Sequence, residues 1–183
     1  MPAPSVCVFC GARSGRNTRY EDAATAVGTM LASHGWRLVF GAGDVGLMGA
    51  TARAAQAAGG STFGVIPKHL VSREMGKRDL TQYVVTETMH ERKKVMYMNS
   101  DAIVVLPGGA GSLDEFFEVL TWRQLGLHDK PIFLLSTDAY WTPLTHLLDH
   151  VISEGFADQS LNTFVQTVDT IQDLTTALRA ALS

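Results

Sequence analysis

The sequence predicts an α/β protein. We expect a single doubly wound, Rossmann-like domain over residues 1–183, with a mostly parallel sheet of about seven strands and helices on both faces. Apolar runs of β type alternate with helical patterns from one end of the chain to the other, as in successive βαβ units. These runs contain few polar residues, which is typical of parallel strands buried on both faces. No repeat, low-complexity tract or linker divides the chain.

The elements follow from the two periodicities. The predicted strands are Val6–Cys10, Leu38–Phe40, Thr62–Ile66, Tyr83–Thr86, Ala102–Leu106, Ile132–Leu135 and Phe164–Val168. A first helix is expected to begin with a capping box, with Thr18 as N-cap and Glu21 three residues on, and to end before Gly35. The later helices are predicted at Leu47–Ala58, Met89–Asn99, Leu113–Leu125, Tyr140–Glu154 and Ile171–Leu182.

Composition narrows the class of protein. The chain has 183 residues, of which 46% are hydrophobic and 18% charged, and a formal net charge of −3. A broad nucleic-acid surface is not expected at this charge. No apolar run approaches the roughly 20 residues that span a bilayer, so no membrane partner is expected. The first residues lack the basic and apolar regions of a secretory signal, and the expected compartment is the cytoplasm.

Cys7 and Cys10 form a C-x-x-C sequence inside an apolar β-type run. A redox pair needs its first thiolate at a helix N-terminus, and two thiols alone do not make a structural zinc site. An odd separation along a strand points the two side chains to opposite faces. We interpret both cysteines as buried and inert, and we expect no metal site.

Two glycine-rich loops follow predicted strands. In the first, Gly41, Gly43 and Gly46 match G-x-G-x-x-G, which is typical of dinucleotide folds. The match follows the second strand rather than the first, and no acidic residue is placed to hold a ribose hydroxyl. A nicotinamide-dependent oxidoreductase is therefore a weak alternative, and the loop is either a tight turn for close packing or a ligand contact.

The second loop follows the strand that ends at Leu106. Gly108, Gly109 and Gly111 leave several backbone N–H groups free, and Ser112 is the expected N-cap of the next helix. No Gly-Lys-Ser/Thr follows, so a phosphate monoester fits better than a triphosphate with magnesium. The alternative is a plain βα turn.

The helix after this loop carries acids that an anion site does not require. Asp114, Glu115, Glu118, Thr121 and Trp122 share about one third of its circumference, and Leu113, Phe116, Phe117, Val119 and Leu120 are predicted to face the core. The helix dipole favours acids in the first turn, but not Glu118 one turn later. A solvated face is the alternative to a functional one.

Arg92, Lys93 and Lys94 lie early in the preceding helix, where positive charge opposes the dipole. A ligand anion or an acidic partner would rationalise them, and Arg suits bidentate contacts with phosphate or carboxylate. A solvated basic face is again the alternative.

Two long motifs carry a family resemblance. The segments "MHERK" (Met89–Lys93) and "PGGAGSLDE" (Pro107–Glu115) resemble the MHxRK and PGGxGTxxE signatures of the LOG, or "lonely guy", family. The segments "VCVFCGARSG", "GAGDVGLMGA", "GVIPKHL", "SREM" and "EVLTWRQLGLHDKP" match in kind and order, so the resemblance covers nearly the whole chain. Three departures, at Ala42, Ser112 and Asp114, remove no functional group.

The resemblance implies a hydrolase, a cytokinin riboside 5′-monophosphate phosphoribohydrolase that releases free base and ribose 5-phosphate, with AMP as a further candidate substrate. It implies no metal or organic cofactor, and a homodimer with the site near the subunit interface. Arg92 and Glu115 correspond to the pair treated as catalytic in the family. The implied substrate-binding residues are Glu74, Arg92, Lys93, Gly109, Ala110, Gly111, Ser112, Leu113, Asp114, Glu115 and Thr121.

These implications suit the chemistry of the reaction. Glycosidic cleavage passes through a positively charged, oxocarbenium-like sugar, which a carboxylate such as Glu115 can stabilise while it orients water. The N–H groups of Gly109–Ser112 would hold the 5′-phosphate, Arg92 would orient the substrate or the leaving base, and Glu74 and Thr121 would fix the nucleotide. The alternative is a non-catalytic nucleotide or phosphorylated-cofactor binding protein of the same fold. A pyridoxal-phosphate decarboxylase is rejected, because no lysine stands in a Schiff-base context.

Overall fold

The computed structural model describes residues 3–74 and 76–183. Its centre is a seven-stranded sheet in the order β4-β3-β2-β1-β5-β6-β7, and every neighbouring pair of strands is parallel. The strands are β1 (Ser5–Phe9), β2 (Arg37–Phe40), β3 (Thr62–Pro67), β4 (Gln82–Thr86), β5 (Ala102–Val105), β6 (Ile132–Leu135) and β7 (Val165–Val168). The predicted α/β class with a parallel sheet is confirmed.

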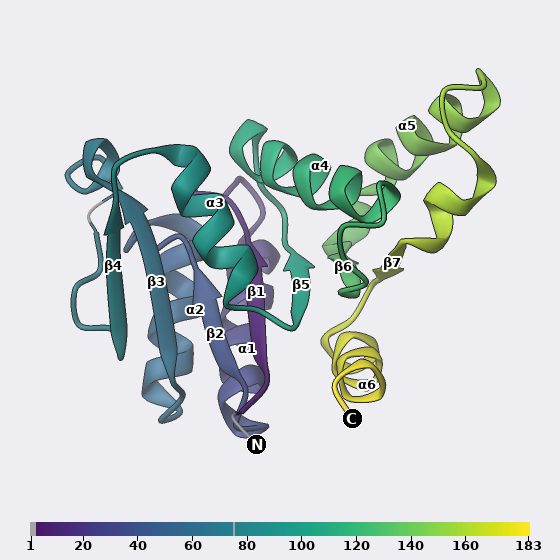
Figure 1. Ribbon diagram of the computed structural model, residues 1–183. Helices are drawn as coiled ribbons and strands as arrows, with labels where there is room; N and C mark the ends of the chain where they lie inside the picture. Colours follow the sequence, from purple (N-terminus) through teal and green to yellow (C-terminus); the bar gives the residue numbers. More distant parts are fainter. Residues whose placement is uncertain (1–2, 75) are drawn as a thin grey trace.

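Helices cover both faces of the sheet, as predicted. They are α1 (Thr18–Ser33), α2 (Gly46–Ala57), α3 (Met89–Met98), α4 (Ala110–Gln124), α5 (Thr142–Ser153) and α6 (Ile171–Ala181). In Figure 1, α1 and α2 lie behind the sheet and α3 in front of it. One buried cluster joins the sheet to α1, α2 and α6, and a second joins it to α3, α4 and α5.

Cys7 and Cys10 illustrate the two layers. The Cys7 side chain packs into the cluster under α3 and α4, whereas Cys10 packs into the cluster under α1 and α2. Both are free thiols, and burial raises the pKa of each well above its ordinary value, with Glu115 raising it further. The two cysteines therefore point to opposite faces of the sheet and stay protonated and unreactive, as the sequence predicted.

The strand order places a crevice at the middle of the sheet. The chain runs outward from β1 to β4, then returns to the other side of β1 and continues through β5, β6 and β7. Between β1 and β5 the direction of winding reverses, and the helices that follow these two strands, α1 and α4, lie on opposite faces of the sheet. Ligands of open α/β sheets bind outside the carboxyl ends of the strands at such a point.

Several helix starts and ends differ from the prediction. Asn17, not Thr18, is the N-cap of α1, because the Asn17 side chain accepts a hydrogen bond from the Arg19 N–H at 3.0 Å. A true capping box occurs in α3, between Thr88 and Glu91. The helix predicted from Tyr140 starts instead at Thr142, because Tyr140 and Trp141 form a turn that follows a 3₁₀ segment, Thr137–Ala139. None of the helices in the described ranges is long and apolar enough to cross a membrane.

Candidate functional site

Loops after β1, β2 and β5 meet at the crevice. The Gly11 N–H donates to the Pro107 carbonyl at 3.0 Å, which ties the loop after β1 to the loop after β5. The Leu47 N–H at the start of α2 donates to the Gly11 carbonyl, also at 3.0 Å. The proline-glycine loop that the sequence marked as an anion site therefore lies at the point where the fold binds ligands.

The start of α4 leaves backbone donors free. The Leu113 N–H donates to the Gly109 carbonyl at 3.0 Å, and the helix begins at Ala110. The N–H groups of Ala110, Gly111 and Ser112 precede this first helical bond and have no intrahelical acceptor. A Cβ placed on Gly109 or Gly111 would meet no atom within 4 Å, so the loop borders open space. These features suit a bound anion.

Ser112 is not the N-cap, contrary to the prediction. Gly109 occupies that position in an extended conformation, without a side-chain cap. Ser112 lies inside the first turn and is only 3% exposed. A Cβ on Gly108 would lie 2.0 Å from the Ser112 Oγ, so the two residues pack directly together. Backbone amides, rather than a capping hydroxyl, form the open side of this loop.

Arg92 is buried and fixed, so the alternative of a solvated basic face does not hold for it, although Lys94 is exposed as that alternative expected. It is 4% exposed. Its Nη2 donates to the Gly41 carbonyl at 2.7 Å and to Glu74 Oε2 at 3.0 Å, and its Nε donates to the Val65 carbonyl at 3.1 Å. The guanidinium therefore connects α3 to the ends of β2 and β3, and it holds the Glu74 carboxylate.

This contact also explains the first glycine loop. A Cβ on Gly41 would lie 2.1 Å from the Arg92 Nη2. Gly46 has φ +56°, and a Cβ there would lie 2.4 Å from the backbone of Ala12 and Arg13. Both glycines are required because other parts of the protein approach them closely. Of the two alternatives for this loop, the structure supports a tight turn for close packing.

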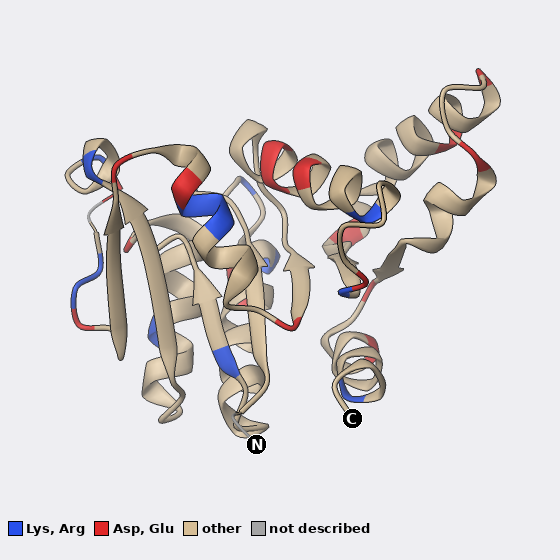
Figure 2. Ribbon diagram, viewed as in Figure 1, with Lys and Arg blue, Asp and Glu red and all other residues tan. Residues whose placement is uncertain are grey.

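Two of the acids on α4 are ion-pair partners of Lys93. Its Nζ donates to Asp114 Oδ2 at 2.9 Å and contacts the Glu118 carboxylate. Burial lowers the pKa of Lys93, but the hydrogen bonds to Glu118 and Asp114 outweigh it and raise the pKa above its ordinary value. The acidic face is therefore not simply solvated: Figure 2 shows the charged turns of α3 and α4 at the same end of the sheet.

Glu115 differs from its acidic neighbours. It is half-buried and forms no ion pair with any residue in the described part of the chain. Burial raises the pKa of Glu115 from 4.5 to about 7; Arg92 opposes this rise, while Glu74 and Asp114 increase it. A carboxyl group that titrates near neutral pH beside a fixed arginine is suited to proton transfer or to stabilising a developing positive charge.

The other predicted residues of α4 lie in different environments. Thr121 is exposed, about three turns from the anion loop, and Leu113 is half-buried against the core. Phe116, Val119 and Leu120 are buried as predicted. Phe117 is 36% exposed and does not face the core, which corrects the prediction. Helical spacing alone misplaced it: the Phe117 ring packs edge-on against its neighbour Phe116 at the border of the buried face of α4.

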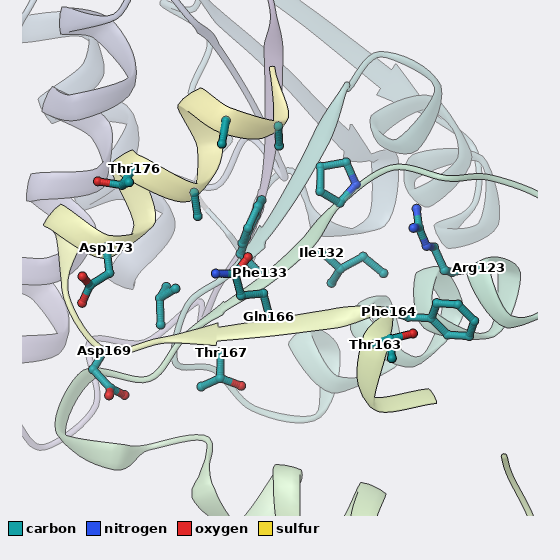
Figure 3. A pocket seen from close by; sticks show the side chains of 15 residues that line it. Arg123, Ile132, Phe133, Thr163, Phe164, Gln166, Thr167, Asp169, Asp173 and Thr176 are labelled. Carbon is teal, nitrogen blue, oxygen red and sulfur yellow. The ribbon is translucent and has the colours of Figure 1, made fainter. Parts of the chain in front are cut away.

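Sequence reasoning did not find one residue that contacts the anion loop. The Tyr140 hydroxyl donates to the Gly108 carbonyl at 2.6 Å, although Tyr140 follows β6, 32 positions away. No motif marks this residue, because the contact depends on the order of the strands. A cavity of about 770 Å³ lies elsewhere, between β6, β7 and α6 (Figure 3), and none of the predicted site residues lines it.

Comparisons with known proteins identify relatives of this chain. A cytokinin riboside 5′-monophosphate phosphoribohydrolase of Rhodococcoides fascians is 42% identical over 98% of this chain and 91% of its own. One from Arabidopsis thaliana is 40% identical over 92% of this chain and 79% of its own. The chain belongs to the LOG family. The family model that matches residues 48–178 of this LOG-family chain is described as "Possible lysine decarboxylase".

Solved structures show the fold of this LOG-family chain in other proteins. The molybdenum cofactor carrier protein of Chlamydomonas reinhardtii superposes with a TM-score of 0.75 at 21% identity, covering 99% of both chains. The molybdenum cofactor binding protein of Rippkaea orientalis gives 0.74 at 21% identity, covering 100% of this chain and 99% of its own. At this identity the likeness concerns the fold alone.

Proposed function

We propose that this protein hydrolyses the N-glycosidic bond of cytokinin riboside 5′-monophosphates, and of AMP, to free base and ribose 5-phosphate. The observation that carries the proposal is the position of Glu115. It is the acid of the PGGAGSLDE segment that stays unpaired with a raised pKa, one helical turn from the free amides of the anion loop. Membership of the LOG family, whose compared members bear this activity in their names, supports the same reaction.

The backbone of the anion loop binds the phosphate group of the substrate. The N–H groups of Ala110, Gly111 and Ser112 bind the 5′-phosphate at the helix start, where the helix dipole also favours negative charge. The ribose then lies over the first turns of α4, with its C1′ beside Glu115. Phosphate binding far from the reacting bond would position the sugar without reacting itself.

Glu115 acts on the sugar and on water. As the bond from C1′ to the base breaks, its electron pair leaves with the base and positive charge develops on the ribose. The Glu115 carboxylate stabilises that charge, orients a water molecule toward C1′ and accepts its proton as the new C–O bond forms. That proton then passes, directly or through solvent, to the nitrogen of the departing base, which leaves as the neutral free base and restores the carboxylate. This role requires the ionised form of Glu115.

Arg92 and Glu74 form the opposite wall. The Arg92 Nε and Nη2 are occupied by protein acceptors, whereas among the described residues Nη1 contacts only the Met89 sulfur, at 3.9 Å. We assign Nη1 to the substrate, where it orients the nucleotide or stabilises the leaving base. Glu74 and Thr121 help to fix the nucleotide. Lys93 supports the site by holding Asp114, and Leu113 supports it by anchoring the first turn of α4.

Decarboxylation with pyridoxal phosphate fits these residues poorly. A Schiff-base lysine needs a depressed pKa, so that its amine is free to react. Lys93, the lysine of this region, has a raised pKa and two carboxylate partners. Its environment therefore favours a permanent ammonium ion.

A substrate panel tests the proposal. The protein is incubated with AMP, other nucleoside monophosphates, prenyl-AMP and the unphosphorylated riboside, and free base is measured by chromatography. We expect release from the monophosphates and much slower release from the riboside. Tight binding of monophosphates without release of base would instead indicate a non-catalytic binding protein, and equal rates with and without phosphate would refute the role of the anion loop.

A further inference from the structure

The Gly108–Gly109 peptide at the anion loop has two possible orientations. In a trans peptide, the carbonyl of one residue and the N–H of the next point in opposite directions. A peptide between two glycines meets little steric resistance to rotation. One orientation presents the Gly109 N–H to a bound anion, and the other presents the Gly108 carbonyl, which would repel it.

Tyr140 selects one of these orientations. Its hydroxyl donates to the Gly108 carbonyl at 2.6 Å and so holds that oxygen on the side of the β6–α5 connection. The Gly109 N–H must then point the opposite way, and no backbone carbonyl among the described residues accepts a hydrogen bond from it. A hydrogen bond from one tyrosine thus adds a fourth amide donor to those of Ala110, Gly111 and Ser112.

The turn that carries Tyr140 is itself held in a strained conformation. Asp138 and Ala139 have φ values of 51° and 58°, in the left-handed region that non-glycine residues rarely adopt. The Asp138 carboxylate accepts hydrogen bonds from Asn17 Nδ2 at 2.5 Å and from Arg19 Nη1 at 2.8 Å, which fix the turn to the start of α1. These contacts offset the strain and position the residue that follows.

Aromatic packing then fixes the Tyr140 ring. The Tyr20 ring of α1 lies edge-on to it, with ring centroids 5.4 Å apart. The Trp141 ring also lies edge-on to it, with ring centroids 4.7 Å apart. The Trp141 Nε1 donates to the Val105 carbonyl at the end of β5, at 3.3 Å. Tyr140 is therefore held relative to the same strand end from which the anion loop begins.

We propose that Tyr140 is a positioning residue that holds the Gly108–Gly109 peptide with its N–H toward the 5′-phosphate of the substrate. The inference rests on the proposed function, because it names the phosphate of that substrate as the ligand. Tyr140 does not touch the substrate; it acts through the orientation of one peptide group.

The variant Tyr140→Phe removes only the hydroxyl. We expect the KM for AMP to rise about three- to tenfold, the size of effect of one lost hydrogen bond, while kcat stays within about twofold. The dissociation constant of inorganic phosphate, measured by calorimetry, should rise by the same factor. The KM for the unphosphorylated riboside should not change.

Tyr20→Phe is the matched control. It removes a hydroxyl from the adjoining ring, and that hydroxyl has no hydrogen-bond partner among the described residues. We expect wild-type phosphate affinity in this variant. If Tyr140→Phe behaves like Tyr20→Phe, or weakens the riboside and the monophosphate equally, the inference is wrong.

The phosphate measurement separates this inference from the proposed function. Weaker phosphate binding in Tyr140→Phe, in a protein that turns over no nucleotide, would support the role of Tyr140 and contradict the function. If Tyr140→Phe does not fold, nitrogen-15 NMR of the wild-type protein decides. The Gly109 amide proton should shift downfield on titration with inorganic phosphate, and an unmoved signal would overturn the inference.

Discussion

Asp114 and Glu115 are adjacent in the sequence, yet their environments differ. Asp114 is an exposed partner of Lys93, whereas Glu115 points into a half-buried position near Arg92 and Glu74 without a cation of its own. A buried carboxylate without a partner is costly. That cost is tolerated at functional sites, where the unpaired group acts on the substrate.

Glu115→Gln tests the role of this carboxylate. Gln keeps the shape and polarity of the side chain but cannot accept a proton or carry the negative charge. We expect kcat for AMP to fall by about two to four orders of magnitude, while AMP still binds with similar affinity by calorimetry. Near-wild-type turnover would rule out the assignment of Glu115.

The raised pKa of Glu115 also predicts how stability depends on pH. The folded protein holds this proton up to about pH 7, whereas the unfolded chain releases it near 4.5. The free energy of unfolding should therefore fall as the pH rises from 4.5 to 7, by up to about 3 kcal/mol from this group. Urea denaturation across this range should show the fall in wild type and its loss in Glu115→Gln.

Activity should show the opposite trend over the same range. Because Glu115 works in its ionised form, kcat/KM for AMP should rise with pH and level off above an apparent pKa of about 7. A profile that is flat between pH 5 and 8 would contradict this.

At the scale of elements, the contact between α3 and α4 depends on buried charge. Lys93 of α3 is 8% exposed and lies between Asp114 and Glu118, which are one turn apart on α4. Removing one member of a buried ion pair leaves the other uncompensated, whereas removing both is tolerated better. This ion cluster therefore sets the position of the helix that carries Glu115.

A double-mutant cycle measures this coupling. Lys93→Met should lower the free energy of unfolding by about 1–3 kcal/mol, and Glu118→Gln by less. The double variant should lose less free energy of unfolding than the sum of the two single losses. It removes both Lys93 and Glu118, so neither side chain is left as a charge without its partner. Additive losses in urea denaturation would show that the contact contributes nothing.

Helix boundaries show how far local patterns can predict an element. The bounds of the strands and of the six helices were predicted to within a few residues. Runs of apolar residues indicate buried strands, and helical spacing of apolar residues indicates helices, so both patterns can be recognised within a short segment. The caps were less predictable. Thr18 and Asn17 are both good N-caps, and Ser112 outranks Gly109 by propensity. The chain direction at each turn, which depends on packing, selected Asn17 and Gly109.

At the scale of the whole molecule, the fold brings apolar side chains to the surface where α3 and α4 end. The Tyr97 ring lies 5.1 Å from Trp122 and 5.3 Å from His128, so the two helix ends pack together. Met98, Leu125 and Leu127 beside them are 65%, 67% and 65% exposed. Apolar surface of this kind often marks a protein contact.

We predict that this surface joins two copies of the chain in a homodimer. Light scattering should give twice the chain mass of 19.8 kDa. Replacing both Leu125 and Leu127 with Asp should yield a monomer, because buried charge opposes association. Phe156→Asp, at a residue 84% exposed after α5, is the control and should leave the mass unchanged. A monomeric wild type would contradict the prediction.

The order of the residues along the chain is enough to predict the class of fold, the anion loop and the segments that resemble the LOG family. Each of these is encoded by neighbouring residues: periodic burial, glycines before a helix, and two compact motifs. Which acid has no ion-pair partner among the described residues is visible only in the folded protein. Asp114, Glu115 and Glu118 share one helical face. Because α3 packs against α4, Lys93 forms ion pairs with Asp114 and Glu118, whereas Glu115 forms none with the described residues. Ion pairing depends on distances between elements far apart in the chain, which local patterns do not encode.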